Sequence, residues 1–491
     1  MLEKHILNLI KKIKVNLKKD EFYVFFYSLF FHLSIFFSVN NKTLFLIFLL
    51  FFYIFYIKIK NVKLSLFILY VLFLPFIKGK NIKFTMIPFI NFNGIYTPFD
   101  YDLLINFADL AIITLAYLIF RNFINNKKEK VTYSILTTNK KLLSFLIFFL
   151  LFVVSSIIFS PIKIVTLLAS LKLIRIALGF IVTFIILKHK QTEKIILGTI
   201  YSSILFQGIW SSLQFFKNSP LGRPIEQMGG IFSSFGYRAT EEISFYRSHG
   251  TFDHPNTLGV FLAVNTIFVI VQSIKNKNNH HKKIATKIVV IFGLAGLIFS
   301  GSRASWASVL IMLGILFIVN KKEFITKFKK NLLTIFFLIP MIPIIIFPRI
   351  AHLLKTFSSG GGFSYREYLT SKALTLIKLY PLGIGYTSFP LILYEKFNFS
   401  SFPAPVHNLF LEIAVETGII SLVFFILFLL ENFKINHLEL HKLKKNTFQF
   451  SLKYASFFTT LTFLFCSMFY PFFWSSNIFE YLWFYLAIMI Y

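Results

Sequence analysis

Long hydrophobic runs, separated by short polar segments, follow one another along the whole chain. The runs have about 15 to 24 residues, close to the ~20 residues with which a helix crosses the hydrocarbon core of a bilayer. Lipid offers no hydrogen-bond partners to backbone groups, so such segments cross it as helices. The pattern predicts an all-α polytopic membrane protein with about 12 to 14 transmembrane helices.

About fourteen candidate spans can be placed, of which the second, third and last are short. They are Phe22–Val39, Thr43–Ile57, Leu64–Ile77, Tyr101–Phe120, Leu142–Phe159, Ile164–Leu187, Ile195–Phe216, Asn256–Ile274, Ile284–Phe299, Ala304–Val319, Asn331–Phe347, His407–Leu430, Leu452–Met468 and Ile478–Ile490. The resulting order is a basic N-terminal segment (1–21), helices (22–216), a loop (217–255), helices (256–347), a larger loop (348–406) and C-terminal helices (407–491).

The distribution of Lys and Arg predicts the orientation of these spans. Residues 1–21 are Lys-rich and show no signal-peptide cleavage site, so we expect a cytoplasmic N-terminus. With that choice, Lys and Arg are concentrated in the cytoplasmic segments. The loops 217–255 and 348–406 then lie outside the cytoplasm, and Tyr365–Leu379 in the second loop has the pattern of an amphipathic helix at the membrane surface.

Composition supports this class and excludes others. Of the 491 residues, 56% are hydrophobic and 14% are charged, against about 25% charged in globular proteins. The net charge of +31 comes from short clusters between the apolar runs and not from one continuous face, so topology explains it better than nucleic acid does. The single cysteine, Cys466, excludes an intrachain disulfide and a cysteine-based zinc cluster.

Four polar motifs lie at the outer membrane face on this topology. They are Arg247-Ser-His-Gly-Thr-Phe-Asp-His-Pro-Asn256, Ser300-Gly-Ser-Arg303, Arg366 with Tyr380-Pro-Leu-Gly-Ile-Gly-Tyr386, and His407-Asn-Leu-Phe-Leu-Glu412. Lys and Arg clusters elsewhere determined the topology, so nothing forced these motifs onto one side. We therefore expect a shared site between helix ends.

In their order and spacing these motifs resemble the O-antigen ligase and polymerase family, over roughly Arg247 to Leu430. The resemblance implies metal-independent, inverting glycosyl transfer from an undecaprenyl diphosphate-linked sugar. It places the family's arginine of the Ser-Arg pair at Arg303 and its histidine of the His-Asn pair at His407. Arg247 and Arg366 are further candidates for holding the diphosphate.

The chemistry of these residue types fits that expectation. A guanidinium group matches phosphate oxygens with two parallel hydrogen bonds and stays charged. A neutral histidine can accept the proton of an attacking hydroxyl. We expect His407 and Arg303 to be catalytic, and the residues expected to bind the diphosphate or glycan are Arg247, Arg366, Arg175, Asn256, Glu412 and Glu416.

Several of these residues also have a structural interpretation. Arg303 could be an interfacial anchor, His407 could begin a helix and Asn256 could cap one. Glu412 and Glu416 could orient His407 or pair with an arginine. His249 and His254 have no further ligand at a metal-like spacing and are interpreted as structural. The glycines of Pro381-Leu-Gly-Ile-Gly385 are expected to form a turn.

Acidic residues raise two further questions. Asp100 and Asp102 form an Asp-x-Asp pair that could hold a metal, although capping explains them as well. Asp109 and Lys172 each lie about 12 Å below the outer end of a predicted span, at 1.5 Å per residue. Charges inside a membrane usually pair, so we expect Asp109 and Lys172 to be partners, with Arg175 reaching toward them or toward the site.

The expected function is O-antigen ligase-like transfer of a glycan at the periplasmic face of the bacterial inner membrane, without a cofactor. The partners would be an undecaprenyl diphosphate-linked donor and, as acceptor, lipid A core or a second lipid-linked glycan; nucleic acid is not expected. The alternatives are a polymerase, and then a flippase for lipid-linked oligosaccharides or an anion transporter. Against transport, the motifs lie on one side and not at the midplane.

Overall fold

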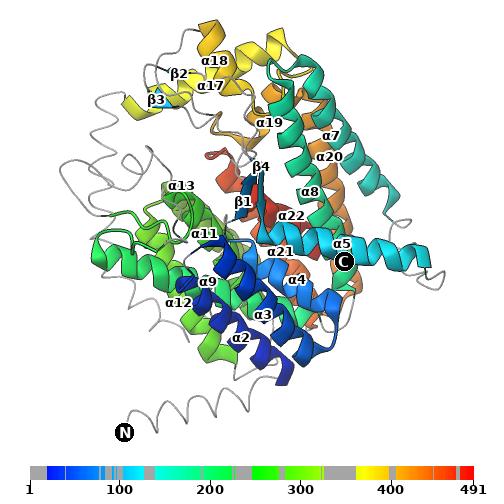
Figure 1. Ribbon diagram of the computed structural model, residues 1–491, viewed down its shortest axis with the longest axis vertical. Helices are drawn as coiled ribbons and strands as arrows, with labels where there is room; N and C mark the ends of the chain where they lie inside the picture. The colour runs from blue at the N-terminus through cyan, green and yellow to red at the C-terminus, as the bar shows by residue number, and fades with distance from the viewer. Residues whose placement is uncertain are drawn as a thin grey trace.

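The computed structural model describes most of the chain (Figure 1). The described residues are 19–38, 40–76, 79–82, 91–92, 95–96, 103–125, 139–188, 192–223, 226, 246–275, 282–321, 323, 325, 361–397, 405–445, 447–471 and 476–491. The predicted span Asn331–Phe347 lies outside them, as do Asp100 and Asp102.

The described part is mainly helical, and its helices follow the hydrophobic runs. The helices are α2 (Lys19–Phe36), α3 (Asn41–Ile59), α4 (Val62–Phe73), α5 (Phe107–Asn125), α7 (Lys140–Ser155), α8 (Lys163–Leu187), α9 (Thr192–Lys217), α11 (Pro255–Lys275), α12 (Lys282–Ser300), α13 (Arg303–Val319), α17 (Gly361–Leu379), α18 (Phe389–Phe397), α19 (Leu409–Thr417), α20 (Ile419–Lys442), α21 (Phe448–Ser467) and α22 (Ser476–Ile490), with a 3-10 turn, η1 (Ser156–Phe159).

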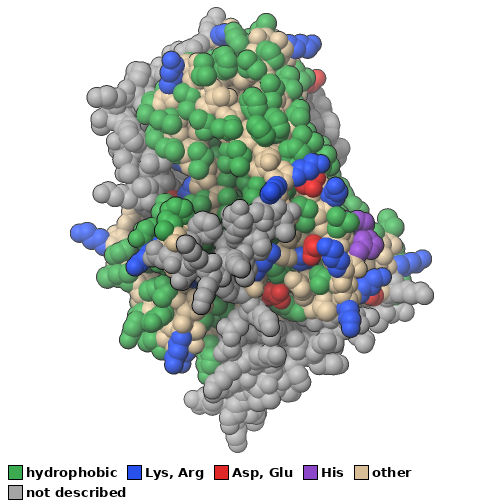
Figure 2. Space-filling model, turned by 90° about the vertical axis from the view of Figure 1, so that its right-hand side faces the viewer, with side chains coloured by type: hydrophobic (Ala, Val, Ile, Leu, Met, Phe, Trp, Pro, Cys, Tyr) green, Lys and Arg blue, Asp and Glu red, His purple; other side chains and the backbone are tan. Residues whose placement is uncertain are grey.

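Many of these helices are suited to a lipid environment. Among the described residues, 6 helices are long and apolar enough to cross a membrane, and further apolar helices are shorter. Large apolar side chains are exposed on α7 and α20, among them Phe148, Leu151, Val423 and Leu430. Figure 2 shows a broad hydrophobic surface on one side of the molecule, with most of the visible charged side chains beyond its lower border. The protein is a polytopic helical membrane protein.

Two short antiparallel strand pairs depart from the all-α expectation. Strand β1 (Gly79–Ile82) pairs antiparallel with β4 (Leu103–Asn106), and β2 (Asn91–Phe92) pairs with β3 (Ile95–Tyr96). Within the span predicted as Tyr101–Phe120, Leu103–Asn106 is therefore extended, and α5 begins at Phe107. Asn106 and Asp109 explain this start, because each side chain accepts a hydrogen bond from the other residue's backbone N–H at 2.7 and 2.8 Å.

The span predicted at His407–Leu430 is divided in the structure. Helix α19 ends at Thr417, and α20 begins at Ile419. Gly418 between them has a φ of 95°, which favours glycine. The N–H of Ile419 donates to the carbonyl of Pro381 at 2.9 Å, so the Pro381–Gly385 turn is held against this break.

Helices α17 and α18 form a cap at one end of the molecule, where they lie above α19 in Figure 1. A helix was predicted at Tyr365–Leu379, and α17 occupies Gly361–Leu379. It buries Leu369, Ala373 and Leu376 in a small core shared with α18 and α19, while Leu374 and Leu379 are exposed. Helix α18 had no counterpart in the prediction.

Candidate active site

A cavity of about 290 Å³ brings together the ends of several helices. Its lining comes from α11 and the segment before it, the start of α13 and the turn before it, α17, the segment before α19, and the end of α21 with the segment after it. The lining residues are Arg247, His254, Asn256, Val260, Gly301, Ser302, Arg303, Ala304, Arg366, His407, Cys466, Phe469 and Tyr470. Residues from all four sequence motifs therefore meet in one place.

Arg247 is held rigidly at the cavity wall. It is 8% exposed, its Nε donates to the carbonyl of Ser300 at 3.0 Å, and its Nη2 donates to Oδ1 of Asn256 at 2.7 Å. Asn256 is the second residue of α11 and itself lines the cavity. Two of the three nitrogens of Arg247 are thus fixed by protein acceptors, which orients the guanidinium group before any substrate binds.

Arg303 and Arg366 bring two more positive charges to the cavity from different helices. Arg303 is the first residue of α13 and follows Gly301, whose φ of 62° allows the sharp turn from α12. Arg366 is on α17. Partial burial and then the charge of Arg303 lower the pKa of Arg366 below its usual value. Neighbouring guanidinium groups repel each other, so this arrangement favours an anion between them.

His407 has the proton arrangement of a base. Its Nδ1 lies 3.1 Å from the carbonyl oxygen of Pro405, which can only accept, so Nδ1 carries the hydrogen and Nε2 keeps its lone pair. Burial and then the charge of Arg366 lower the pKa of His407 to about 4. The next residue, Asn408, caps α19 by accepting from Phe410 and Leu411. Since Asn408 does the capping, His407 is not needed to begin the helix.

Residues 288–426 match the family model of the O-antigen ligases. This part of the chain is similar to the O-antigen ligases. It contains Arg303, Arg366 and His407, whereas Arg247 and Asn256 lie before it. The assignment supports an O-antigen ligase or polymerase type of function, as the motifs predicted. A comparison with curated proteins finds no match.

Two other cavity residues were not predicted as site residues. His254 was interpreted as structural and Tyr470 was not considered, yet both line the cavity. The Tyr470 hydroxyl lies 3.1 Å from that of Thr257 on α11, and its ring is 6.2 Å from that of His254. The His-Pro-Asn order at the start of α11 was the available signal for His254, because it places the ring at a helix start, on the same predicted membrane face as Arg247.

His249, by contrast, is fully buried and is not among the residues lining the cavity. Its Nδ1 contacts the carbonyl of Phe252 at 2.6 Å, and Oε1 of Gln214 accepts from its backbone N–H at 3.1 Å. Burial is the largest cause of the lowered pKa of His249. Its surroundings agree with the structural interpretation.

Three predicted binding residues lie away from the cavity lining: Arg175, Glu412 and Glu416. Glu412 and Glu416 are fully buried on α19. The carboxylate of Glu416 accepts from the backbone N–H of Thr387 at 2.9 Å and of Phe389 at 3.3 Å. Glu416 therefore anchors the segment after the Pro381–Gly385 turn.

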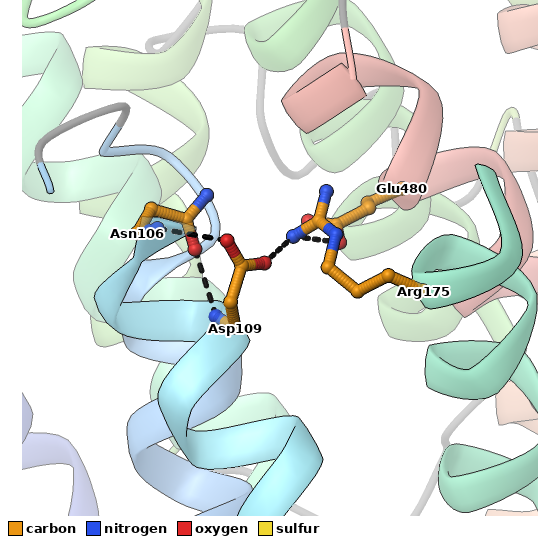
Figure 3. A network of polar contacts seen from close by, with 4 residues as sticks. All are labelled: Asn106, Asp109, Arg175 and Glu480. Carbon is orange, nitrogen blue, oxygen red and sulfur yellow. Dashed lines mark hydrogen bonds and ion pairs between the residues drawn. The ribbon is translucent and has the colours of Figure 1, made fainter. Parts of the chain in front are cut away.

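Arg175 lies in a separate ionic network between helices (Figure 3). Its Nη1 contacts Oδ1 of Asp109 on α5 and lies 2.9 Å from Oε1 of Glu480 on α22. The sequence predicted Lys172 as the partner of Asp109 and Arg175 as reaching toward that pair or toward the site. The structure gives Arg175 as the ion-pair partner of Asp109, and it adds Glu480, which the prediction did not include.

The glycines of the Pro381–Gly385 turn have the expected role. Gly383 and Gly385 have φ values of 94° and 99°. A Cβ at Gly383 would lie 2.6 Å from the carbonyl oxygen of Glu416, and one at Gly385 would lie 2.5 Å from Cβ of Ser160. The glycines therefore allow both a positive φ and close packing.

The described residues also bear on whether the site could bind a metal ion. Within the described ranges, no three His, Cys, Asp or Glu side chains gather as ligands for a metal ion. The described residues of the cavity lining include arginine and histidine but no carboxylate. Asp100 and Asp102 are outside the described residues, so their interpretation stays a prediction. The positive charges of the described lining favour an anion.

Proposed function

We propose that this protein is an O-antigen ligase-like glycosyltransferase. It transfers a glycan from undecaprenyl diphosphate to a hydroxyl of an acceptor such as lipid A core, for lipopolysaccharide or surface polysaccharide biosynthesis. The observation that carries the proposal is the meeting of Arg247, Arg303 and Arg366 with His407 in one cavity, whose described lining residues include no carboxylate. Three guanidinium groups match a diphosphate, and a neutral histidine beside them supplies a base.

In the proposed reaction the acceptor hydroxyl attacks the anomeric carbon from the face opposite the diphosphate. Nε2 of His407 takes the hydroxyl proton as the new C–O bond forms. The bond between the anomeric carbon and the diphosphate breaks, and its electron pair stays on the diphosphate oxygen. The arginines neutralise the charge that grows there, and the anomeric configuration is inverted.

The proposal needs no metal ion, because the guanidinium groups take the role of a cation at the diphosphate. Arg247 is already oriented by Ser300 and Asn256, so little reorganisation is needed during the reaction. Holding donor and acceptor together in the cavity would supply much of the remaining rate enhancement.

We further propose that the cavity faces the periplasm in the bacterial inner membrane, with the N-terminus in the cytoplasm. The support is the concentration of Lys and Arg in the segments that this orientation makes cytoplasmic. The lipid-linked donor would then reach the cavity from the bilayer. Its polyprenyl chain would remain among lipid-exposed apolar helices.

A polymerase of the same family would use the same donor, base and arginines, but a second lipid-linked repeat unit as acceptor. The choice is tested with purified protein and undecaprenyl diphosphate-linked repeat units, given either lipid A core or no further acceptor. Transfer to the core supports the ligase, and chain growth without core identifies a polymerase. Absence of any glycosidic product would contradict both and favour transport of a lipid-linked oligosaccharide or an anion.

A further inference from the structure

The two histidines that line the cavity carry their ring protons on opposite nitrogens. In His407 the contact between Nδ1 and the carbonyl of Pro405 leaves Nε2 as an acceptor. In His254 the backbone N–H of Asn256 points at Nδ1 at 3.0 Å. A backbone N–H can only donate, so Nδ1 of His254 is the acceptor and the ring proton is on Nε2. The remaining nitrogen of His407, Nε2, can accept a proton, whereas the remaining nitrogen of His254, Nε2, can only donate a hydrogen bond.

The position of His254 is fixed by the start of α11. Its carbonyl accepts from Thr257 and Leu258 at 3.0 and 3.2 Å, which makes His254 the cap residue of this helix. Pro255 follows as the first helical residue, where its fixed φ is favourable. The ring therefore stands at the positive end of a helix of 21 residues, where anions are stabilised.

His254 stays neutral in this environment. Burial is the largest cause that lowers its pKa, to about 3; the charge of Arg247 acts in the same direction, as would protonation of His249 or His407. Protonation would also place a hydrogen on Nδ1, against the N–H of Asn256. At neutral pH the ring thus offers one N–H without adding a fourth positive charge to the three arginines.

Asn256 connects His254 to the arginine nearest to it in sequence. Its backbone N–H holds Nδ1 of His254, and its side-chain oxygen accepts from Nη2 of Arg247. One residue thus orients a guanidinium group and a neutral imidazole at the same part of the cavity wall. Since arginine has no acceptor, a ligand that satisfies both groups must bring the acceptors, as a phosphate does.

We propose that His254 donates a hydrogen bond from Nε2–H to a phosphate oxygen of the lipid-linked diphosphate, beside Arg247. This inference rests on the proposed function and adds a residue to its diphosphate site. The proton stays on Nε2 throughout, because the departing diphosphate is a stable anion that needs no acid. The hydrogen bond would strengthen as the C–O bond breaks and charge grows on the diphosphate.

Two substitutions separate this role from helix capping. Asparagine at position 254 places an oxygen where Nδ1 was and is a favourable cap, but it has no group at the position of Nε2. Glutamine can place an amide N–H near the position of Nε2, but it caps poorly. If His254 only caps α11, His254→Asn should lose less activity than His254→Gln. If His254 is a hydrogen-bond donor, His254→Gln should lose less activity than His254→Asn.

The experiment compares wild type, His254→Asn and His254→Gln as purified protein. It measures kcat and KM for the lipid-linked glycan, binding of sugar-free undecaprenyl diphosphate, and the unfolding temperature. We expect His254→Asn to keep its unfolding temperature within a few degrees, to bind undecaprenyl diphosphate more weakly and to lose about 100-fold in kcat. His254→Gln should keep kcat within about tenfold of wild type.

The outcomes for this inference and for the proposed function are distinct. Suppose that the wild type turns over. If kcat is then unchanged in His254→Asn, or if both variants lose kcat equally, the donor role is overturned but the proposed function is not. If the wild type made no product, the proposed function would fail. The role of His254 would then be tested by the binding of undecaprenyl diphosphate alone. Weaker binding by His254→Asn would support the inference, and equal affinity of the wild type and His254→Asn would overturn it.

Discussion

The reactivity of His407 depends on the charge beside it. Burial is the main reason that the imidazole is neutral, and Arg366 stabilises the neutral form further, because a second positive charge nearby is unfavourable. With a pKa of about 4, the base form is present at all pH values above that point. We therefore expect kcat/KM of the wild type to be flat near neutral pH and to fall only as the pH approaches 4.

Replacing Arg366 with glutamine removes this neighbouring charge and should raise the pKa of His407. The Arg366→Gln variant should therefore lose activity on acidification at a higher pH than the wild type does. The measurement is the pH profile of kcat/KM, normalised to each protein's plateau, so that weaker diphosphate binding does not obscure the shift.

Lys372→Gln is the matched control, because Lys372 is on the same helix but lies over the rings of Tyr368 and Phe397. Its acid limb should coincide with that of the wild type. An unchanged acid limb in Arg366→Gln would contradict the coupling between Arg366 and His407.

The individual site residues differed in how far the sequence predicted them. Arg303 and His407 lie in short motifs whose order was recognisable, and both line the cavity. Glu416 was chosen for its closeness to His407 in the sequence, but its helix turns the carboxylate toward Thr387 and Phe389. Tyr470 gave no signal, since an aromatic residue after an apolar run is common at membrane interfaces.

The break between α19 and α20 positions the turn that follows α17. Besides the contacts of the Glu416 carboxylate, the N–H of Gly385 donates to the carbonyl of Glu416 and the N–H of Ile384 donates to that of Val415, at 2.9 and 3.1 Å. Backbone and side chain of one helix end therefore hold the turn together. The cap that carries Arg366 is attached to the membrane helices through this contact.

Glu416→Ala should destabilise the protein, because the buried N–H groups of Thr387 and Phe389 would lose their acceptor. Each unsatisfied group costs about 1–3 kcal/mol, so the unfolding temperature of the purified protein should fall clearly. Glu431→Ala is the control, since its partner Lys141 is largely exposed and such pairs contribute only about 0–1 kcal/mol. Equal unfolding temperatures of Glu416→Ala and Glu431→Ala would show that the anchor is unimportant.

The apolar runs predicted the described helices well, but not the places where they are interrupted. Gly418 lies inside a run that is hydrophobic on both sides, and a single glycine is tolerated within a helix. The reason for the break is the packing of Pro381 and Leu382 against Gly418, and these residues are distant from it in the sequence. The pairing of β1 with β4 was missed for the same reason, because it joins segments that are separated in the sequence.

The network of Arg175 joins helices from both ends of the chain. Asp109 on α5, Arg175 on α8 and Glu480 on α22 meet in the interior, and Asp109 also caps its own helix through Asn106 (Figure 3). Hydropathy alone could not predict which helices are neighbours. An ionisable residue inside a span did indicate that a partner must exist.

Arg175→Met should strongly destabilise the protein, by about 3–5 kcal/mol, because two buried carboxylates would lose their shared counter-charge. Adding Glu480→Gln to Arg175→Met should restore part of that loss, since one carboxylate then becomes neutral. Thermal unfolding of the wild type, both single variants and the double variant measures the coupling. Strictly additive losses would contradict a shared ionic network.

The proposed orientation can be tested by cysteine labelling, because the one native cysteine, Cys466, is buried. Lys378 on α17 and Lys444 after α20 are both exposed. In intact spheroplasts, a membrane-impermeant maleimide should label Lys378→Cys, and it should label Lys444→Cys only after lysis. The reverse pattern would place the cavity on the cytoplasmic side and contradict the proposed topology.

The central claim is that His407 and the arginines catalyse glycosyl transfer without a metal ion. The most direct measurement is the transfer rate of purified wild type, His407→Ala and Arg303→Ala with lipid-linked donor and lipid A core, each with and without EDTA. We predict that wild-type transfer is unaffected by EDTA and that both variants lose at least about 100-fold in rate. Transfer that EDTA abolishes, or that persists at the wild-type rate in His407→Ala, would contradict the account.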